Sequence, residues 1–302
     1  MRNLKSRISR SFVLVVACVL ISSLGFSKVH AEEDECHDSN ADVFEMLSYD
    51  AKTGSTYISY FKNVVKDPDV ELVSPANCDV PIENQQLRSP TPLSHVSNAN
   101  ISPYYNVVMC RNGFDIDNNG VIETWTITSG AFVYNDLVFT CAHGIYWYAQ
   151  SKTANVVQVY KALNSSSLPN TYYSLSGWHI PTQFTSSADS DYDWAVLVTS
   201  STTSTWFGYG YASNISNKSV NSAGYVDQPS YYYLMQESPG TMSSTSSYRF
   251  SSTMYTIGGR SGSAAFDSNG IVWGELQSHI SGYYGYGCLV TSQVYSVLEA
   301  LK

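Results

Sequence analysis

Residues 255–266 read Tyr-Thr-Ile-Gly-Gly-Arg-Ser-Gly-Ser-Ala-Ala-Phe, which places Ser261 among three glycines and ahead of small and apolar residues typical of a β-strand. A nucleophilic serine needs this setting. Glycines let the backbone come close to a ligand, and nearby N–H groups can then point at the oxygen of an attacked carbonyl. A plain glycine-serine turn between two strands is the alternative for this stretch alone. The rest of the chain distinguishes the two interpretations.

Two further stretches carry groups that can act on such a serine. Residues 131–144 predict two short apolar strands around an Asn-Asp turn, and they end in Thr-Cys-Ala-His-Gly. Asp193 stands directly before Trp-Ala-Val-Leu-Val, which is typical of a buried strand. Asp189 and Asp191 compete for the role of the acid. We prefer Asp193 because it alone adjoins the strand.

The order His143, Asp193, Ser261 is that of chymotrypsin-like enzymes, whereas α/β-hydrolases run Ser, acid, His and subtilisin-like enzymes run Asp, His, Ser. Thr-Cys-Ala-His-Gly, Asp-Trp-Ala-Val-Leu and Gly-Gly-Arg-Ser-Gly-Ser resemble the histidine, aspartate and serine motifs of trypsin-like serine proteases. The serine motif is most similar to that of the bacterial glutamyl endopeptidases. The resemblance covers about residues 100–302, and it depends on the order and spacing of all three motifs.

This resemblance implies an all-β fold of two six-stranded antiparallel barrels with a C-terminal helix. It also implies a serine endopeptidase that hydrolyses protein or peptide substrates through an acyl-enzyme, with Ser261 as nucleophile, His143 as general base and Asp193 as the acid that orients the imidazole. The backbone N–H groups of Gly259 and Ser261 would form the oxyanion hole. Two other functions fit the same residues: a protease-like binding protein without turnover, and an esterase-like hydrolase.

The resemblance also implies where the substrate side chain binds. In glutamyl endopeptidases a threonine five residues before the nucleophile and a histidine on a later strand hold the glutamate. Thr256 matches the threonine, but Leu276 takes the place of the histidine, and His279 lies three residues on. A hydroxyl beside an apolar wall favours an uncharged side chain, because an unpaired carboxylate in a partly dry pocket is costly. Glutamate preference would need an irregular turn that brings His279 back toward Thr256, and no acid lies near Tyr255 to bind Lys or Arg.

The residue before the nucleophile departs from the animal enzymes of the family. There an aspartate receives the new N-terminal amine after the pro-segment is cleaved. Arg260 cannot accept a cation, so we do not expect activation through that ion pair. Loss of the pro-segment would instead unblock the cleft.

The chain divides into three predicted parts. Residues 1–31 are typical of an export signal, because basic residues precede an apolar run over residues 12–24 and small residues follow. That run is shorter than the roughly 20 residues that span a bilayer, so we expect a secreted protein without membrane association. Residues 32–88 are acidic at their start and poor in apolar residues, which indicates a pro-segment, with a small independent domain as the alternative. Residues 89–302 would be the protease domain, which begins with a proline- and serine-rich linker at residues 89–103.

Composition and cysteines narrow the function further. The net charge of −9 does not favour nucleic-acid binding, which calls for a basic surface. We also expect the protein to be a monomer.

Removal of the signal leaves an odd number of cysteines, namely Cys36, Cys78, Cys110, Cys141 and Cys288. An exported protein permits disulfides, and we expect Cys36 to pair with Cys78 and Cys110 with Cys141. Trypsin-like enzymes place a cysteine just after the histidine, whereas here Cys141 precedes it.

From residue 104 onward short β-type runs alternate with turn residues. We predict strands at residues 105–110, 121–127, 156–159, 172–178, 194–199, 205–212, 231–235, 247–250, 263–266, 270–276 and 288–291. Residues 292–301 carry apolar side chains at helical spacing. The C-terminal helix is therefore predicted from the pattern as well as from the resemblance.

The loop between the first two of these strands carries oxygen side chains at alternate positions before a glycine. Asp115, Asp117, Asn119 and Glu123 could bind a structural calcium ion. The alternative is a tight Asn-Gly turn with solvated acids, which we favour. An EF-hand is not predicted, because its twelfth position is Thr126 rather than a bidentate glutamate. The expected chemistry itself requires no cofactor.

Overall fold

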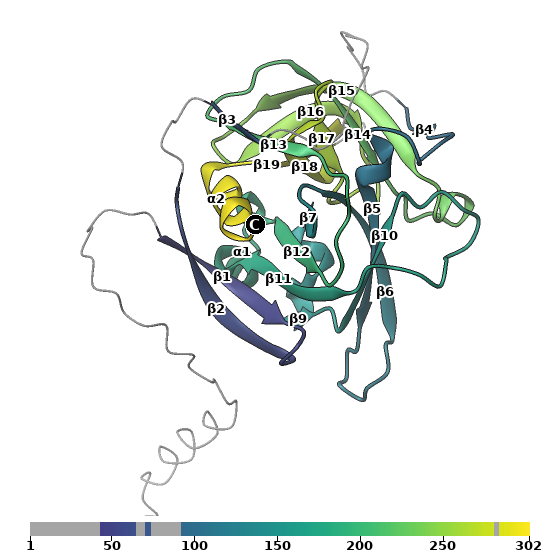
Figure 1. Ribbon diagram of the computed structural model, residues 1–302, viewed down its shortest axis with the longest axis vertical. Helices are drawn as coiled ribbons and strands as arrows, with labels where there is room; N and C mark the ends of the chain where they lie inside the picture. Colours follow the sequence, from purple (N-terminus) through teal and green to yellow (C-terminus); the bar gives the residue numbers. More distant parts are fainter. Residues whose placement is uncertain (1–42, 65–69, 74–91, 281–283) are drawn as a thin grey trace, which may run out of the picture. The chain divides into compact units, whose positions relative to one another are not determined.

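The computed structural model describes residues 43–64, 70–73, 92–280 and 284–302. The predicted signal, most of the predicted pro-segment, Cys36 and Cys78 lie outside these residues. In the described residues nearly all regular structure is β, arranged as an eight-stranded sheet, a nine-stranded sheet and a two-stranded ribbon (Figure 1). None of the helices described is long and apolar enough to cross a bilayer.

The eight-stranded sheet, which we call the first sheet, is an open path of antiparallel strands. Its order is β10 (Val156–Lys161), β5 (Val107–Phe114), β6 (Thr124–Phe132), β7 (Leu137–Thr140), β12 (Ala195–Thr199), β11 (Leu175–Pro181), β1 (Val43–Asp50) and β2 (Ser55–Lys62). One isolated bridge, Val159 to Tyr173, joins β10 to the chain just before β11. The ribbon of β8 (Tyr146–Trp147) and β9 (Lys152–Thr153) lies between β7 and β10 in the sequence.

The nine-stranded sheet, which we call the second sheet, closes on itself. Its order is β17 (Ala264–Phe266), β14 (Lys218–Gly224), β15 (Gln236–Ser244), β16 (Arg249–Tyr255), β19 (Tyr284–Leu289), β18 (Ile271–Ile280), β13 (Gly208–Ala212) and β3 (Val70–Val73), with β4 (Ser94–His95) paired to β15. A further pairing between β17 and β18 closes the six strands from β17 to β18 into a ring. This barrel is antiparallel throughout, as predicted.

The two-barrel prediction is therefore confirmed for one barrel only. The predicted strand at 231–235 is wrong, because Pro229–Tyr231 forms the turn of 3-10 helix η5 and the chain then bends before β15 begins. Strands β14 and β15 were not predicted, since both contain several Ser and Gly residues and few β-branched residues, and β15 also contains a proline.

Part of the predicted pro-segment belongs to the first sheet. The β1–β2 hairpin pairs with β11 through Met46 to Asp50, along the lower edge of the fold in Figure 1. Phe44, Met46 and Phe61 are buried, and the buried Ser48 hydroxyl lies 2.7 Å from Nδ1 of His179 on β11. Apolar residues are sparse here, but they alternate along β1, which is enough to cover the sheet edge.

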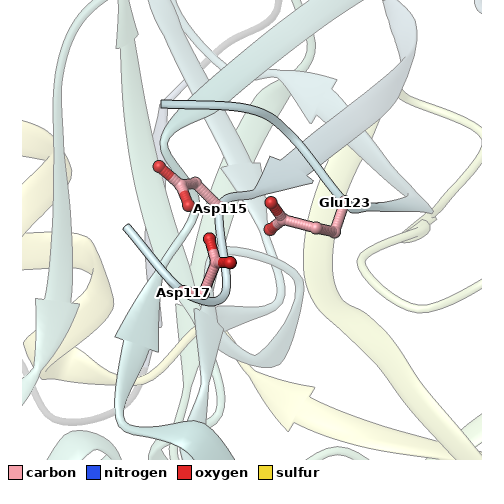
Figure 2. Close-up of side chains that lie close together, drawn as sticks. All are labelled: Asp115, Asp117 and Glu123. Carbon is pink, nitrogen blue, oxygen red and sulfur yellow. The ribbon is translucent and has the colours of Figure 1, made fainter. Parts of the chain in front are cut away.

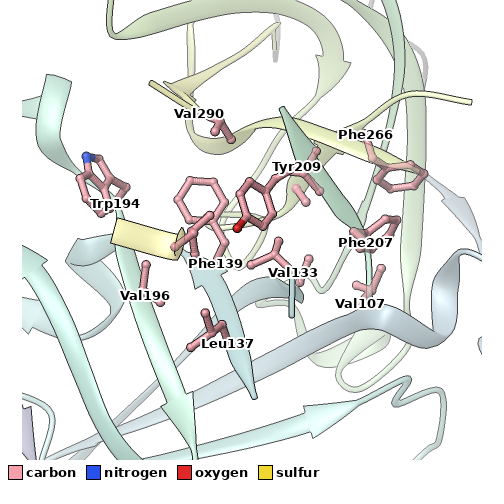
Figure 3. Close-up of a cluster of buried hydrophobic side chains, with 14 of the residues drawn as sticks. Val107, Val133, Leu137, Phe139, Trp194, Val196, Phe207, Tyr209, Phe266 and Val290 are labelled. Carbon is pink, nitrogen blue, oxygen red and sulfur yellow. The ribbon is translucent and has the colours of Figure 1, made fainter. Parts of the chain in front are cut away.

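The main core lies where the two sheets meet. The first sheet contributes Phe139 and Val196, the second contributes Tyr209 and Phe266, and Trp194 lies just before β12 (Figure 3). All five are at most 1% exposed. The functional groups on the two sheets therefore sit on either side of one continuous packed interior.

The predicted C-terminal helix is present as α2 (Ser292–Ala300), capped by the Thr291 hydroxyl, which accepts from the Val294 N–H. Its buried face includes Val297 and Leu298. The other helical segments are α1 (Thr182–Ser187), η1 (Tyr104–Asn106), η2 (Ala142–Gly144), η3 (Tyr148–Gln150) and η4 (Ser190–Tyr192).

Candidate active site

His143 lies in η2, the single turn that follows β7, and Asp193 lies in the turn that leads into β12. Because β7 and β12 are neighbours in the first sheet, these turns emerge side by side. Oδ2 of Asp193 is 2.7 Å from Nδ1 of His143, and Oδ1 accepts a 2.8 Å hydrogen bond from the His143 backbone N–H. The carboxylate thus fixes both the ring and the backbone of the histidine.

The two competing acids have other partners. Asp189 caps η4 by accepting from the Asp191 N–H. Asp191 lies 3.8 Å from the guanidinium of Arg249. Of the three candidates, Asp193 alone contacts His143, as the sequence predicted, and it is 7% exposed whereas the other two are more accessible.

Nδ1 of the His143 imidazole is held by Asp193, and Nε2 lies near the thiol of Cys141. Burial lowers the pKa of His143, but the contacts with Cys141 and the carboxylate of Asp193 raise that pKa well above 6.5. The Cys141 sulfur lies 3.7 Å from Nε2. A general base must be neutral, so proton acceptance by His143 will strengthen as pH rises through this raised pKa.

The turn that carries Ser261 joins β16 to β17 and is held by backbone hydrogen bonds on both sides. The N–H of Gly262 donates to Leu276 at 2.6 Å, and the N–H of Leu276 donates to Ser263 at 2.9 Å. From the first sheet, the N–H of Ser129 donates to the Ser261 carbonyl at 2.7 Å. The nucleophile candidate is therefore tied to both sheets at once.

Close packing at Gly262 brings this turn against the histidine segment. Gly262 has φ +83°, and a Cβ there would lie 2.1 Å from the Ser129 carbonyl oxygen and 3.0 Å from the Cys141 nitrogen. Only glycine fits this position. In this structure the Ser261 hydroxyl donates to the Gln277 carbonyl at 2.7 Å, so it must rotate before it can transfer a proton to His143.

Two N–H groups of the turn are available for a ligand. Gly259 has φ +88°, and the turn is closed by a bond from Arg260 N–H to the Ile257 carbonyl. Within the residues that the structure describes, the N–H groups of Gly259 and Ser261 donate to no protein acceptor. The side chain of Arg260 points away from them and is fully buried, donating to the Gln236 carbonyl. The predicted oxyanion donors are thus free and next to the hydroxyl.

The predicted substrate-pocket residues converge at Gly285. A Cβ there would lie 2.8 Å from both the Thr256 hydroxyl and a Leu276 methyl group. The Thr256 hydroxyl is buried and has no partner among the described residues. The register of β18 against β19 shifts between Leu276 and Ser278, so the backbone of His279 stands opposite Gly285. The approach of the His279 side chain to Thr256 stays a prediction.

The acidic loop forms a hairpin between β5 and β6, as predicted. One ligand oxygen from each of Asp115, Asp117 and Glu123 lies within 4.8 Å of the others (Figure 2). These carboxylates also accept backbone hydrogen bonds, such as those from Asn119 and Gly120 to Asp115. The fourth predicted ligand, Asn119, uses its side-chain oxygen to accept a hydrogen bond from the Val121 N–H. Both calcium binding and the plain turn therefore stay predictions.

The predicted disulfide within the catalytic domain is not formed. Cys110, Cys141 and Cys288 are buried free thiols. Burial raises the pKa of the Cys141 thiol, which keeps it protonated.

Sequence reasoning missed two polar residues on β18. Gln277 donates to the Ser190 carbonyl at 2.8 Å and contacts the Cys288 sulfur at 2.9 Å, which links the second sheet to the Asp193 turn. Glu275 is completely buried. The available signal was the appearance of Glu and Gln inside a strand that otherwise reads as buried.

Comparisons with known proteins agree with this geometry. Residues 128–274 match the model of the trypsin-like peptidase domain family, a range that includes His143, Asp193 and Ser261. These residues are similar to trypsin-like peptidase domains. The match supports a hydrolase of the peptidase type. No curated protein sequence matches the chain.

The solved structures similar to this chain include several proteases. A glutamyl endopeptidase bound to MPD is 21% identical with a TM-score of 0.59, and the alignment covers 69% of this chain and 95% of that one. The protease Anisep from Arthrobacter nicotinovorans is 16% identical with a TM-score of 0.55, covering 69% and 100%. A thermostable serine protease, AL20, is 14% identical with a TM-score of 0.54, covering 66% and 98%. These likenesses show the chymotrypsin-like fold.

Proposed function

We propose that the protein is a serine endopeptidase that hydrolyses peptide bonds through a Ser261 acyl-enzyme. The observation that carries the proposal is the Asp193 carboxylate, which holds both the Nδ1 and the backbone N–H of His143 at 2.7 and 2.8 Å. With Nδ1 engaged, Nε2 becomes the nitrogen that can accept a proton. A carboxylate with a purely structural role would not need to fix which ring nitrogen of His143 carries the proton.

The reaction uses groups of this chain alone. Ser261 transfers its proton to Nε2 of His143 as its Oγ attacks the substrate carbonyl, and Asp193 stabilises the imidazolium that forms. The carbonyl oxygen moves into the free N–H groups of Gly259 and Ser261, each worth about 3 kcal/mol. His143 then protonates the leaving amine. In the second half of the reaction His143 takes a proton from water, which attacks the acyl carbon, and the released Oγ of Ser261 takes that proton back.

Further parts of the proposal rest on the sequence. Residues 1–31 would direct export, so that the protein is secreted to the extracellular or periplasmic space. Residues 32–88 would form a pro-segment, and the enzyme would act as a monomer on protein or peptide substrates. The isolated bridge between β10 and the chain before β11 supports closure of the first sheet into a barrel. This would be the other of the two barrels that the family resemblance implies.

A fluorophosphonate probe tests the chemistry directly. The probe forms a bond between phosphorus and Oγ of an activated serine and releases fluoride, with the serine proton passing to the histidine. We expect labelling of the wild-type protein, no labelling of Ser261→Ala, and turnover of peptide substrates. Faster turnover of esters than of every peptide would point to an esterase.

Ser263→Ala is the matched control, because Ser263 is a serine two residues away whose fully buried hydroxyl has no hydrogen-bond partner among the described residues. It should label like the wild type. Folded wild-type protein that neither labels nor cleaves would contradict the proposal and leave the binding protein.

A further inference from the structure

One contact in the candidate active site has no part in the reaction described so far. The Cys141 sulfur lies 3.7 Å from Nε2 of His143, the ring nitrogen that receives the Ser261 proton in the proposed reaction. Among the residues that the structure describes, this sulfur is the one hydrogen-bond partner of Nε2. The reaction itself needs no thiol there, because the proton passes directly between the serine hydroxyl and the imidazole.

The spacing of this sulfur and this nitrogen suits a metal ion. Zinc binds thiolate sulfur at about 2.3 Å and imidazole nitrogen at about 2.1 Å, and it prefers tetrahedral geometry. With these bond lengths, the 3.7 Å between Sγ of Cys141 and Nε2 of His143 corresponds to a sulfur–zinc–nitrogen angle of about 115°. That angle is close to the tetrahedral value. The two ligand atoms therefore already stand at the separation that one zinc ion requires.

The other ring nitrogen of His143 is held in the way that metal-binding histidines require. Such histidines usually donate their second ring N–H to a carboxylate, which fixes the tautomer and makes the ligand nitrogen more basic. Asp193 takes this place, with Oδ2 at 2.7 Å from Nδ1. The arrangement that prepares Nε2 to accept a proton therefore prepares it equally to bind a cation.

The two ligand side chains differ in their exposure to solvent. The side chain of His143 is 38% exposed, whereas Cys141 is a buried free thiol. A metal ion would reach Nε2 from solvent and then meet the sulfur on the protein side. Metals bind the thiolate, so the thiol proton passes to solvent as the sulfur–zinc bond forms. Water molecules would complete the tetrahedron.

We propose that Cys141 and His143 form a binding site for a zinc ion that reversibly inhibits the enzyme. The inhibition rests on the proposed function, whereas the binding of the metal does not. Zinc on Nε2 occupies the lone pair that would accept the Ser261 proton, so turnover stops until the metal leaves. Thiolate and imidazole select zinc over magnesium and calcium, which prefer oxygen ligands. The sulfur therefore makes the site more selective than a catalytic histidine alone.

Titration of peptidase activity with zinc chloride tests the inhibition. We expect zinc to inhibit the wild type, a chelator to restore its activity, and magnesium chloride to have no effect. Cys141→Ala should keep near wild-type activity without metal and should need at least about tenfold more zinc for half inhibition. Cys110→Ala is the matched control, because Cys110 is another buried free thiol of the first sheet, and it should respond as the wild type does. Equal zinc sensitivity of Cys141→Ala and the wild type would overturn the proposal.

Binding of cobalt(II), which accepts the same ligands as zinc, provides a measurement that does not depend on activity. A cobalt–thiolate bond gives an intense charge-transfer band in the near ultraviolet. We expect this band in the wild type and in Ser261→Ala, its removal by zinc, and its loss in Cys141→Ser, which preserves the size of the side chain. A wild type without the band would overturn the proposal. Absence of probe labelling at Ser261 with the band present would defeat the proposed function alone, so the two failures can be told apart.

Discussion

The two sheets hold their functional groups by different means. The second sheet closes into a ring, and the turn with Ser261 and Gly259 is fixed by backbone hydrogen bonds to strands on either side. The first sheet is open, and His143 at its end is fixed by one side chain, Asp193. Backbone ladders tolerate most substitutions, whereas a single carboxylate does not. The histidine half of the site should therefore be the more sensitive to mutation.

The largest effect should come from Asp193→Asn, which removes the charge that fixes His143. The amide favours the wrong tautomer and gives up the ion pair, so we expect kcat to fall about 10⁴-fold with little change in fold. Steady-state kinetics measures the fall, and circular dichroism checks the fold. The double variant with Ser261→Ala should lose little more than the Ser261→Ala single variant, because the groups act as a unit. Near wild-type turnover in Asp193→Asn would contradict the expectation that the histidine half of the site is the more sensitive to mutation.

Substrate preference tests the other side of the comparison, the predicted pocket on the closed second sheet. Thr256 and Leu276 meet at Gly285, which favours an uncharged side chain, and the β18 register that sets His279 opposite Gly285 keeps glutamate as the alternative. We expect cleavage after Lys or Arg to be at least about 10²-fold slower than after the preferred residue, since the predicted pocket residues Thr256, Leu276 and His279 include no acid. A peptide library measures the ratios. Dominant cleavage after Lys or Arg would show that the pocket is placed wrongly.

The open sheet depends for stability on the hairpin at its edge. Met46→Ala empties a fully buried site on β1, so we expect the free energy of unfolding to fall by about 2–5 kcal/mol in urea titrations. Tyr60→Ala on the neighbouring strand β2 is the control, because Tyr60 is 66% exposed, and it should change stability by less than about 0.5 kcal/mol. Equal small losses in both variants would mean that the hairpin adds nothing to the first sheet.

The smallest effect is expected at the acidic hairpin loop of the same sheet. If the converging carboxylates of Asp115, Asp117 and Glu123 bind calcium, millimolar calcium should raise the melting temperature by about 2 °C and a chelator should reverse the rise. Asp117→Ala should abolish the response. Melting curves of the wild type that ignore both additions would establish the plain turn.

The sequence predicted the parts of the molecule whose patterns are local. His143 follows a short apolar run, and Asp193 and Ser261 each precede one, so the nearby strand ends were visible. Helix α2 has the apolar spacing of its buried face. The pairing of β1 with β11 was not visible, because it joins segments far apart in the chain and buries few apolar side chains. The burial of Glu275 was equally hidden, since it arises only when β17, β18 and β19 close the barrel.

The hairpin at the edge of the first sheet changes what proteolytic processing would produce. A cut after Arg88 breaks one peptide bond, but it breaks none of the pairing between β1 and β11 and leaves the contact of Ser48 with His179 intact. The segment before the cut would then stay bound as a second chain. A processed enzyme purified under native conditions should yield two N-terminal sequences in equal amounts, and denaturant should be needed to separate the fragments.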